Sequence, residues 1–78
     1  MVNLLGEEGY SGDAIYEGLD EVLKIKGAFV HLYGKKKTKP FRKMGHVTVL
    51  ADSIEEARAK ALLVKNKLKV VSKITQNI

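Results

Sequence analysis

The feature that most constrains this chain is a run of positive charge enclosed by two apolar segments. Six of the nine residues from Lys35 to Lys43 are Lys or Arg, and no acidic residue interrupts them. The whole chain has 14 basic and 9 acidic side chains, so the residues outside this basic segment are close to neutral. Such a block repels itself and stays in water unless an anion balances its charge.

The two apolar segments predict a β-hairpin. Residues 28–33 and 44–50 are rich in β-branched and aromatic side chains, and each is bounded or interrupted by Gly. Two strands of a hairpin need only two to five connecting residues, and this connection is longer, which indicates a loop with a function. Composition alone leaves open a second interpretation, in which the lysines only improve solubility.

Two cations stand near the ends of the predicted strands, where the scaffold can hold them. Lys35 follows the first strand behind Gly34, and Arg42 precedes the second strand behind Pro40. Arg42 offers a planar fork that suits two phosphate oxygens, whereas Lys35 offers a point charge. The basic segment therefore predicts a site for a small anion, and a phosphate monoester fits it best.

Other segments predict a strand, two helices and an apolar tail. Residues 2–5 favour a short strand that ends at Gly6. Apolar residues at helical spacing predict a helix that begins after Ser11 or Asp13 and ends near Ile25. The tail from residue 68 to 78 is expected to add a strand or to extend the second helix.

The second predicted helix carries the clearest local signal in the sequence. Ser53 is expected to cap its N-terminus, and Glu56 is expected to reach back and complete a capping box. The helix should run to about Lys67. Five residues are predicted to form its buried stripe: Ile54, Ala57, Ala61, Val64 and Leu68.

These elements predict one α+β domain over residues 1–78, with a small antiparallel, barrel-like or sandwich-like sheet and two packed helices. The chain has no cysteine, so a disulfide or a thiolate zinc site is excluded. No apolar run is long enough to span a bilayer. We expect a cytoplasmic protein without a membrane partner.

No catalytic or metal-binding constellation is visible in the sequence. The acidic residues cluster at helix starts, where capping explains them. His31 and His46 can face each other across the hairpin, but two histidines without carboxylates at ligand spacing make a poor metal site. We therefore expect both histidines to be packed or to lie at the rim of the sheet, and we expect the isolated chain to be inactive.

Nucleic acid is the rival ligand for the basic segment. Tyr33 and Phe41 flank the lysines and are able to stack on bases. However, proteins that bind duplexes usually spread positive charge over a whole face, and here the charge occupies one loop. A stand-alone basic module that binds nucleic acid or another anionic partner remains the alternative hypothesis.

A family resemblance centres on the same loop. The chain resembles the C-terminal domain of the ATP-grasp enzyme N5-carboxyaminoimidazole ribonucleotide synthetase in three places: Tyr33-Gly34-Lys35, Pro40, and the run from Arg42 to Thr48. Asn3-Leu4-Leu5-Gly6 and Gly27-Ala28 also resemble this family. A formate-dependent formyltransferase of purine synthesis is similar here but differs after the Met-Gly pair. The chain departs from the family at Phe41, where a small residue, usually Gly, stands.

The resemblance implies a C-terminal fragment of a three-domain ligase that carboxylates aminoimidazole ribonucleotide with bicarbonate, in a parent that is a homodimer. ATP and Mg²⁺ would be bound by the ATP-grasp and N-terminal domains, which are absent here, and this fragment would hold neither. Carried over by position, Lys35 and Arg42 would bind the 5′-phosphate of the substrate, and Lys43 would assist. The resemblance implies no catalytic residue and no metal ligand in this chain.

Overall fold

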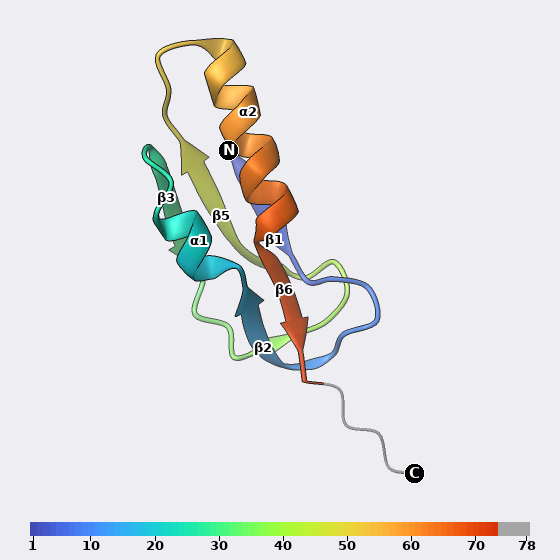
Figure 1. Ribbon diagram of the computed structural model, residues 1–78. Coiled ribbons are helices and arrows are strands. Elements are labelled where there is room, and N and C mark those ends of the chain that lie inside the picture. The colour runs from blue at the N-terminus through green and yellow to red at the C-terminus, as the bar shows by residue number, and fades with distance from the viewer. Residues whose placement is uncertain (74–78) are drawn as a thin grey trace.

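The hairpin predicted around the basic segment is present in the computed structural model, which describes residues 1–73 (Figure 1). Its strands are β3 (Ala28–Leu32) and β5 (Lys43–Val49), which pair antiparallel with His31 opposite His46. The predicted N-terminal strand is confirmed as β1 (Val2–Leu5), which pairs antiparallel with the other edge of β5. The first sheet therefore has the order β1-β5-β3.

A second three-stranded sheet has the order β4-β2-β6. The strand β2 (Gly12–Glu17) lies between β4 (Lys37–Thr38), which belongs to the basic segment, and β6 (Lys69–Ser72). Both pairings are antiparallel, and a parallel bridge between Gly6 and Val70 links the two sheets. The α+β class with antiparallel sheets and two helices is confirmed, and the tail adds a strand rather than extending the helix.

The predicted helix from residue 13 to Ile25 is wrong over its first half. Residues 12–17 form β2, and only α1 (Leu19–Leu23) is helical. Gly18 starts α1 with φ of 78°, and a Cβ at this position would collide with the carbonyl oxygen of Lys67. The apolar spacing in β2 is compatible with either structure, and pairing with β4 and β6 decides in favour of the strand.

The second helix, α2 (Ile54–Lys67), has the predicted bounds. The hydroxyl of Ser53 accepts a hydrogen bond of 3.1 Å from the backbone N–H of Glu56, which confirms the cap. The second half of the predicted capping box differs, because the Glu56 carboxylate forms an ion pair of 3.1 Å with Lys60. That lysine, one turn further along the helix, lowers the pKa of Glu56 by hydrogen bonding and by charge attraction.

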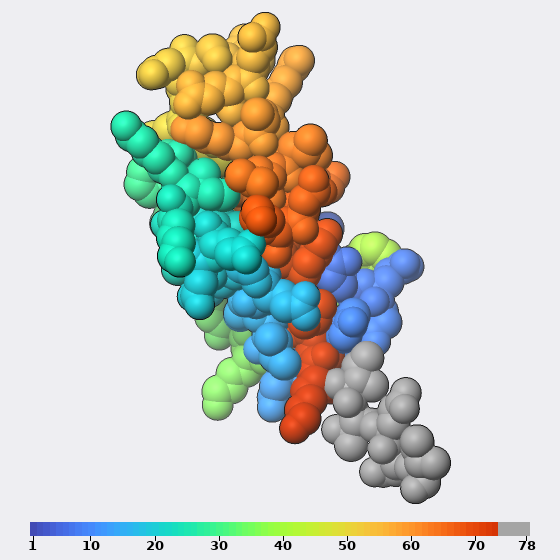
Figure 2. Space-filling view, viewed as in Figure 1, coloured from blue at the N-terminus to red at the C-terminus, as the bar shows by residue number. Residues whose placement is uncertain are grey.

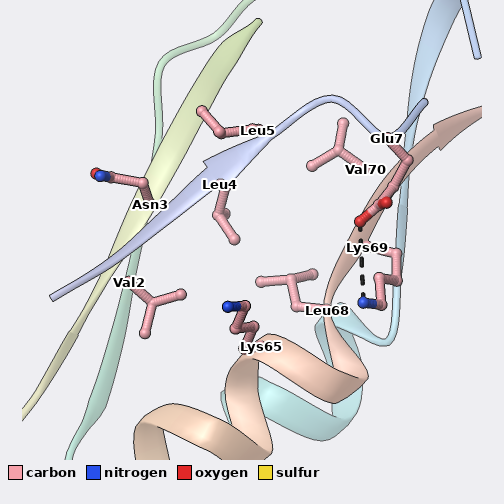
Figure 3. Close-up of a pocket in the computed structure, with 9 residues that line it drawn as sticks. All are labelled: Val2, Asn3, Leu4, Leu5, Glu7, Lys65, Leu68, Lys69 and Val70. Carbon is pink, nitrogen blue, oxygen red and sulfur yellow. Dashed lines mark ion pairs between the residues drawn. The ribbon is translucent and has the colours of Figure 1, made fainter. Parts of the chain in front are cut away.

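Both helices lie on one face of the first sheet and enclose the core. Figure 2 shows α1 next to the band formed by α2 and β6, and an ion pair of 3.0 Å between Glu21 and Lys67 joins the two helices. In Figure 3, Leu4 points from β1 toward Leu68 at the end of α2. Apolar side chains from both sheets and both helices are buried together: Leu4, Val22, Met44, Val47, Val64, Leu68 and Val70.

The buried stripe predicted for α2 is correct at its C-terminal half and wrong at its start. Val64 and Leu68 are buried, and Ala57 and Ala61 are half-buried. Ile54 is 72% exposed, because the first turn of α2 extends beyond the strands that cover the rest of the helix (Figure 1). Residues 74–78 of the predicted apolar tail, Ile74 among them, lie outside the described residues.

Candidate anion-binding site

The basic segment is more than a free loop at the tip of a hairpin. Its strand β4 pairs with the start of β2, so that Lys37 lies opposite Asp13 and Thr38 lies opposite Gly12. The backbone N–H of Ala14 donates a hydrogen bond of 2.8 Å to the carbonyl oxygen of Lys36. The first half of the segment is therefore fixed to the second sheet, although the predicted hairpin alone would leave it in solvent.

The second half of the segment is fixed to the end of β1. Gly6 donates a backbone hydrogen bond of 2.9 Å to the carbonyl oxygen of Arg42 and accepts one of 2.8 Å from the N–H of Phe41. The N–H of Arg42 also donates to the carbonyl oxygen of Lys39, at 3.1 Å, and closes a tight turn. The basic segment thus has two separate backbone anchors.

The side chains of Lys35 and Arg42 are both directed at the segment's own backbone. The ammonium of Lys35 donates a hydrogen bond of 2.8 Å to the carbonyl oxygen of Lys43, and Nη1 of Arg42 donates one of 3.3 Å to the carbonyl oxygen of Lys37. The Lys35 ammonium thus lies at the start of β5, which begins at Lys43 directly after Arg42. Lys35 and Arg42 are half-buried, whereas the Lys43 side chain is exposed.

Most of the charge in the segment is uncompensated. Lys37 forms an ion pair of 2.6 Å with Asp13, and both side chains are largely exposed. Within residues 1–73, the other five cations of the segment form no ion pair with a carboxylate: Lys35, Lys36, Lys39, Arg42 and Lys43. An anion that enters this region therefore meets several cations whose charge no acidic side chain offsets.

The two histidines face each other across the β3–β5 ladder, on the outer face of the first sheet, where His31 is exposed and His46 is half-buried. Their rings are stacked, with centroids 4.9 Å apart and planes 10° apart. Within the described part of the chain, no group of three or more His, Asp or Glu side chains is placed to hold a metal ion. Sequence reasoning missed the contact of His46 with Tyr33, whose hydroxyl lies 2.9 Å from Nδ1 of His46.

Comparison with known proteins identifies the family. A family model described as "Phosphoribosylaminoimidazole carboxylase C-terminal domain" matches residues 1–60. The chain belongs to this family. The matched region includes the whole basic segment between β3 and β5.

A solved relative has the same fold. The crystal structure of N5-carboxyaminoimidazole ribonucleotide synthetase from Thermotoga maritima is 57% identical, with a TM-score of 0.87 over 92% of this chain and 20% of that one. N5-carboxyaminoimidazole ribonucleotide synthase from Synechocystis is 46% identical over 70% of this chain and 14% of its own length. A formate-dependent phosphoribosylglycinamide formyltransferase from Marinobacter nauticus is 40% identical over 81% of this chain and 16% of its own length. The chain thus spans about a seventh of the length of these two curated relatives.

The structure gives physical reasons for the motif that carries the family resemblance. Met44 is completely buried in the core. A Cβ on Gly45 would collide with the carbonyl oxygen of His31, so this position requires Gly for close approach of β3 and β5. Phe41, where the family resemblance implies a small residue, has φ of 64° and is 65% exposed. Gly adopts this left-handed conformation without strain, so a small residue is expected here on physical grounds as well.

Proposed function

We propose that this chain is the C-terminal domain of an ATP-dependent ligase that carboxylates 5-aminoimidazole ribonucleotide with bicarbonate in purine biosynthesis. The similarity to N5-carboxyaminoimidazole ribonucleotide synthetase from T. maritima, over nearly the whole chain, supports this proposal. The parent enzyme would have three domains, form a homodimer and act in the cytoplasm. Among the described residues, no helix is long and apolar enough to cross a membrane.

In this proposal the domain binds the 5′-phosphate of the ribonucleotide through Lys35 and Arg42, and Lys43 assists. The observation that carries the assignment is the anchored, uncompensated charge of the basic segment. Hydrogen bonds to Gly6 and Ala14 fix its backbone, while its cations other than Lys37 pair with no carboxylate in residues 1–73. A phosphate dianion supplies the missing negative charge, and the Arg42 fork fits two of its oxygens.

The contribution of this domain to catalysis is positional. Holding the phosphate fixes the ribonucleotide, so that its amine is presented at one place and in one orientation in the active site of the parent enzyme. Bound ATP and Mg²⁺ would supply the activation of bicarbonate. The residues described here do not fit a metal site, because no cluster of three suitable side chains exists among them. No chemical step is therefore assigned to a residue of this chain.

The test is substitution of Arg42 in an intact enzyme that carries this chain. We expect Arg42→Ala to weaken ribonucleotide binding by about 2–4 kcal/mol, the scale for loss of one partner of a hydrogen-bonded charge pair. The affinity for ATP should hardly change. A matched control is Arg58→Ala, which removes an exposed arginine from α2, outside the basic segment. Loss of ATP binding with unchanged ribonucleotide affinity would show that the assignment is wrong.

A further inference from the structure

The outer face of the first sheet carries a row of rings that the proposed function does not use. His31 in β3 and His46 in β5 occupy opposite positions in the antiparallel ladder, and their rings stack at 4.9 Å. Side chains at directly opposed positions lie close enough to support each other. Because β5 is the central strand of this sheet, the backbone of His46 is held on both sides, by β1 and by β3.

Tyr33 extends this row toward the basic segment. It follows His31 by two residues, so both side chains leave the chain on the same face of the sheet. The backbone N–H of Tyr33 donates a hydrogen bond of 3.0 Å to Met44, and the hydroxyl is 2.9 Å from Nδ1 of His46. The tautomer of His46 decides which of these two groups donates. The ring of Tyr33 is thus fixed at its backbone and at its hydroxyl.

The ammonium of Lys35 lies over the fixed ring. It is 6.0 Å from the centroid of the Tyr33 ring and 2.8 Å from the carbonyl oxygen of Lys43. A cation over the face of an aromatic ring is attracted by the electron density of that face. A free lysine side chain loses much rotamer entropy when it is held in one place, so a side chain that is already placed binds a ligand at lower cost.

We propose that Tyr33, fixed by His46 and through it by His31, is a positioning residue that holds the Lys35 ammonium ready for a phosphate monoester. The inference rests on the proposed function, because it takes Lys35 as a phosphate ligand. It adds a role for three side chains that touch no phosphate themselves. His46 is held in the central strand β5, its contact with Tyr33 restrains the Tyr33 ring, and that ring restrains the Lys35 ammonium in the basic segment.

The test is a double-mutant cycle on the 78-residue chain, with ribose 5-phosphate as the probe. Tyr33→Leu should lower the affinity about two- to fivefold, the range for one exposed cation–π contact. In a Lys35→Met background the same change should have no further effect, because Tyr33 acts through Lys35. Tyr33→Phe, which keeps the ring and loses the hydroxyl, should lie between wild type and Tyr33→Leu.

The control is Phe29→Leu, a change to another exposed aromatic residue on the same face of β3. It should leave the affinity unchanged, and the thermal unfolding midpoint of each variant shows whether it folds. If Lys35→Met binds like wild type, the phosphate site itself is wrong, and the inference falls with it. If Lys35→Met weakens binding but Tyr33→Leu does not, or if the two losses simply add, only the role of Tyr33 is overturned.

Discussion

The ammonium of Lys35 donates a hydrogen bond of 2.8 Å to the carbonyl oxygen of Lys43, and this contact joins the two ends of the basic segment. The acceptor belongs to the backbone, so the contact does not depend on the side chain of Lys43. Lys35 therefore has two roles, as a charge and as a tie between the ends of β3 and β5, whereas Lys43 contributes only a charge from an exposed side chain. The two lysines should differ in their effects on binding.

The first prediction ranks these two lysines. Lys43→Ala should weaken binding of ribose 5-phosphate less than Lys35→Ala does, because it removes one exposed charge and leaves the tie intact. Calorimetric or NMR titration of both variants at one ionic strength measures the two losses, and the fixed salt matters because exposed charges are screened. An equal or larger loss for Lys43→Ala would contradict the ranking.

The second prediction concerns the left-handed turn at Phe41. A residue with a side chain pays about 1–2 kcal/mol in this conformation, whereas Gly does not. We therefore expect Phe41→Gly to unfold at a higher urea concentration than Phe41→Ala, although Gly usually weakens a fold relative to Ala. Both variants lose the same exposed ring, so comparing them isolates the backbone. Greater stability of the Ala variant would argue against positive φ at this turn.

The third prediction separates the two descriptions of residues 13–25. If Gly18 lay inside a helix, Gly18→Ala would raise stability by about 1 kcal/mol. The structure predicts the opposite, a loss of at least about 1–2 kcal/mol, because φ is 78° and the added Cβ meets the Lys67 carbonyl oxygen. Urea unfolding of the single variant gives the sign directly, and the sign decides whether a helix runs through Gly18.

The difference between sequence and structure at this point has a physical cause. The hairpin and α2 were predictable because their signals are local: strand periods bounded by Gly, and a serine cap followed by apolar spacing. The strand β2 is held by its partners β4 and β6, which lie far from it along the chain, and no local sequence pattern reports such pairing. The backbone hydrogen bonds that fix the basic segment to β2 and to Gly6 could not be predicted for the same reason, because they also join residues far apart in the sequence.

The candidate site shows the same division. Lys35 and Arg42 were recognised because they adjoin the predicted strand ends. The contact of Tyr33 with His46 depends on register, and it became visible only when His31 was placed opposite His46. Tyr33, two residues before Lys35, could therefore be recognised from the sequence only together with the pairing of His31 and His46 in the ladder.

The fourth prediction concerns pH and the start of α2. Lys60 holds the pKa of the Glu56 carboxyl below its ordinary value of 4.5. A carboxyl with a lowered pKa in the folded state stabilises the fold above its unfolded pKa, and this stabilisation is lost as the pH falls through the folded pKa. Glu56→Gln should therefore be less stable than wild type at pH 7, and the difference should shrink below about pH 4.5.

Chemical unfolding of wild type and Glu56→Gln at several pH values provides this measurement. Glu55→Gln is a suitable control, because Glu55 is a neighbouring acid in the first turn of α2 that forms no ion pair with any described residue. Its difference from wild type should change less with pH over the same range. A constant gap between wild type and Glu56→Gln down to acidic pH would show that the Lys60 pair does not act in solution.

The central claim is that the basic segment binds a phosphate monoester, and NMR titration of the nitrogen-labelled chain with ribose 5-phosphate tests it most directly. We predict saturable shifts of backbone amides within residues 33–44, and loss of these shifts when Lys35→Met and Arg42→Ala are combined. The alternative ligand is tested by oligonucleotides of increasing length at two salt concentrations. The account would be contradicted by no saturable response to ribose 5-phosphate, together with oligonucleotide affinity that rises with length and falls steeply with salt.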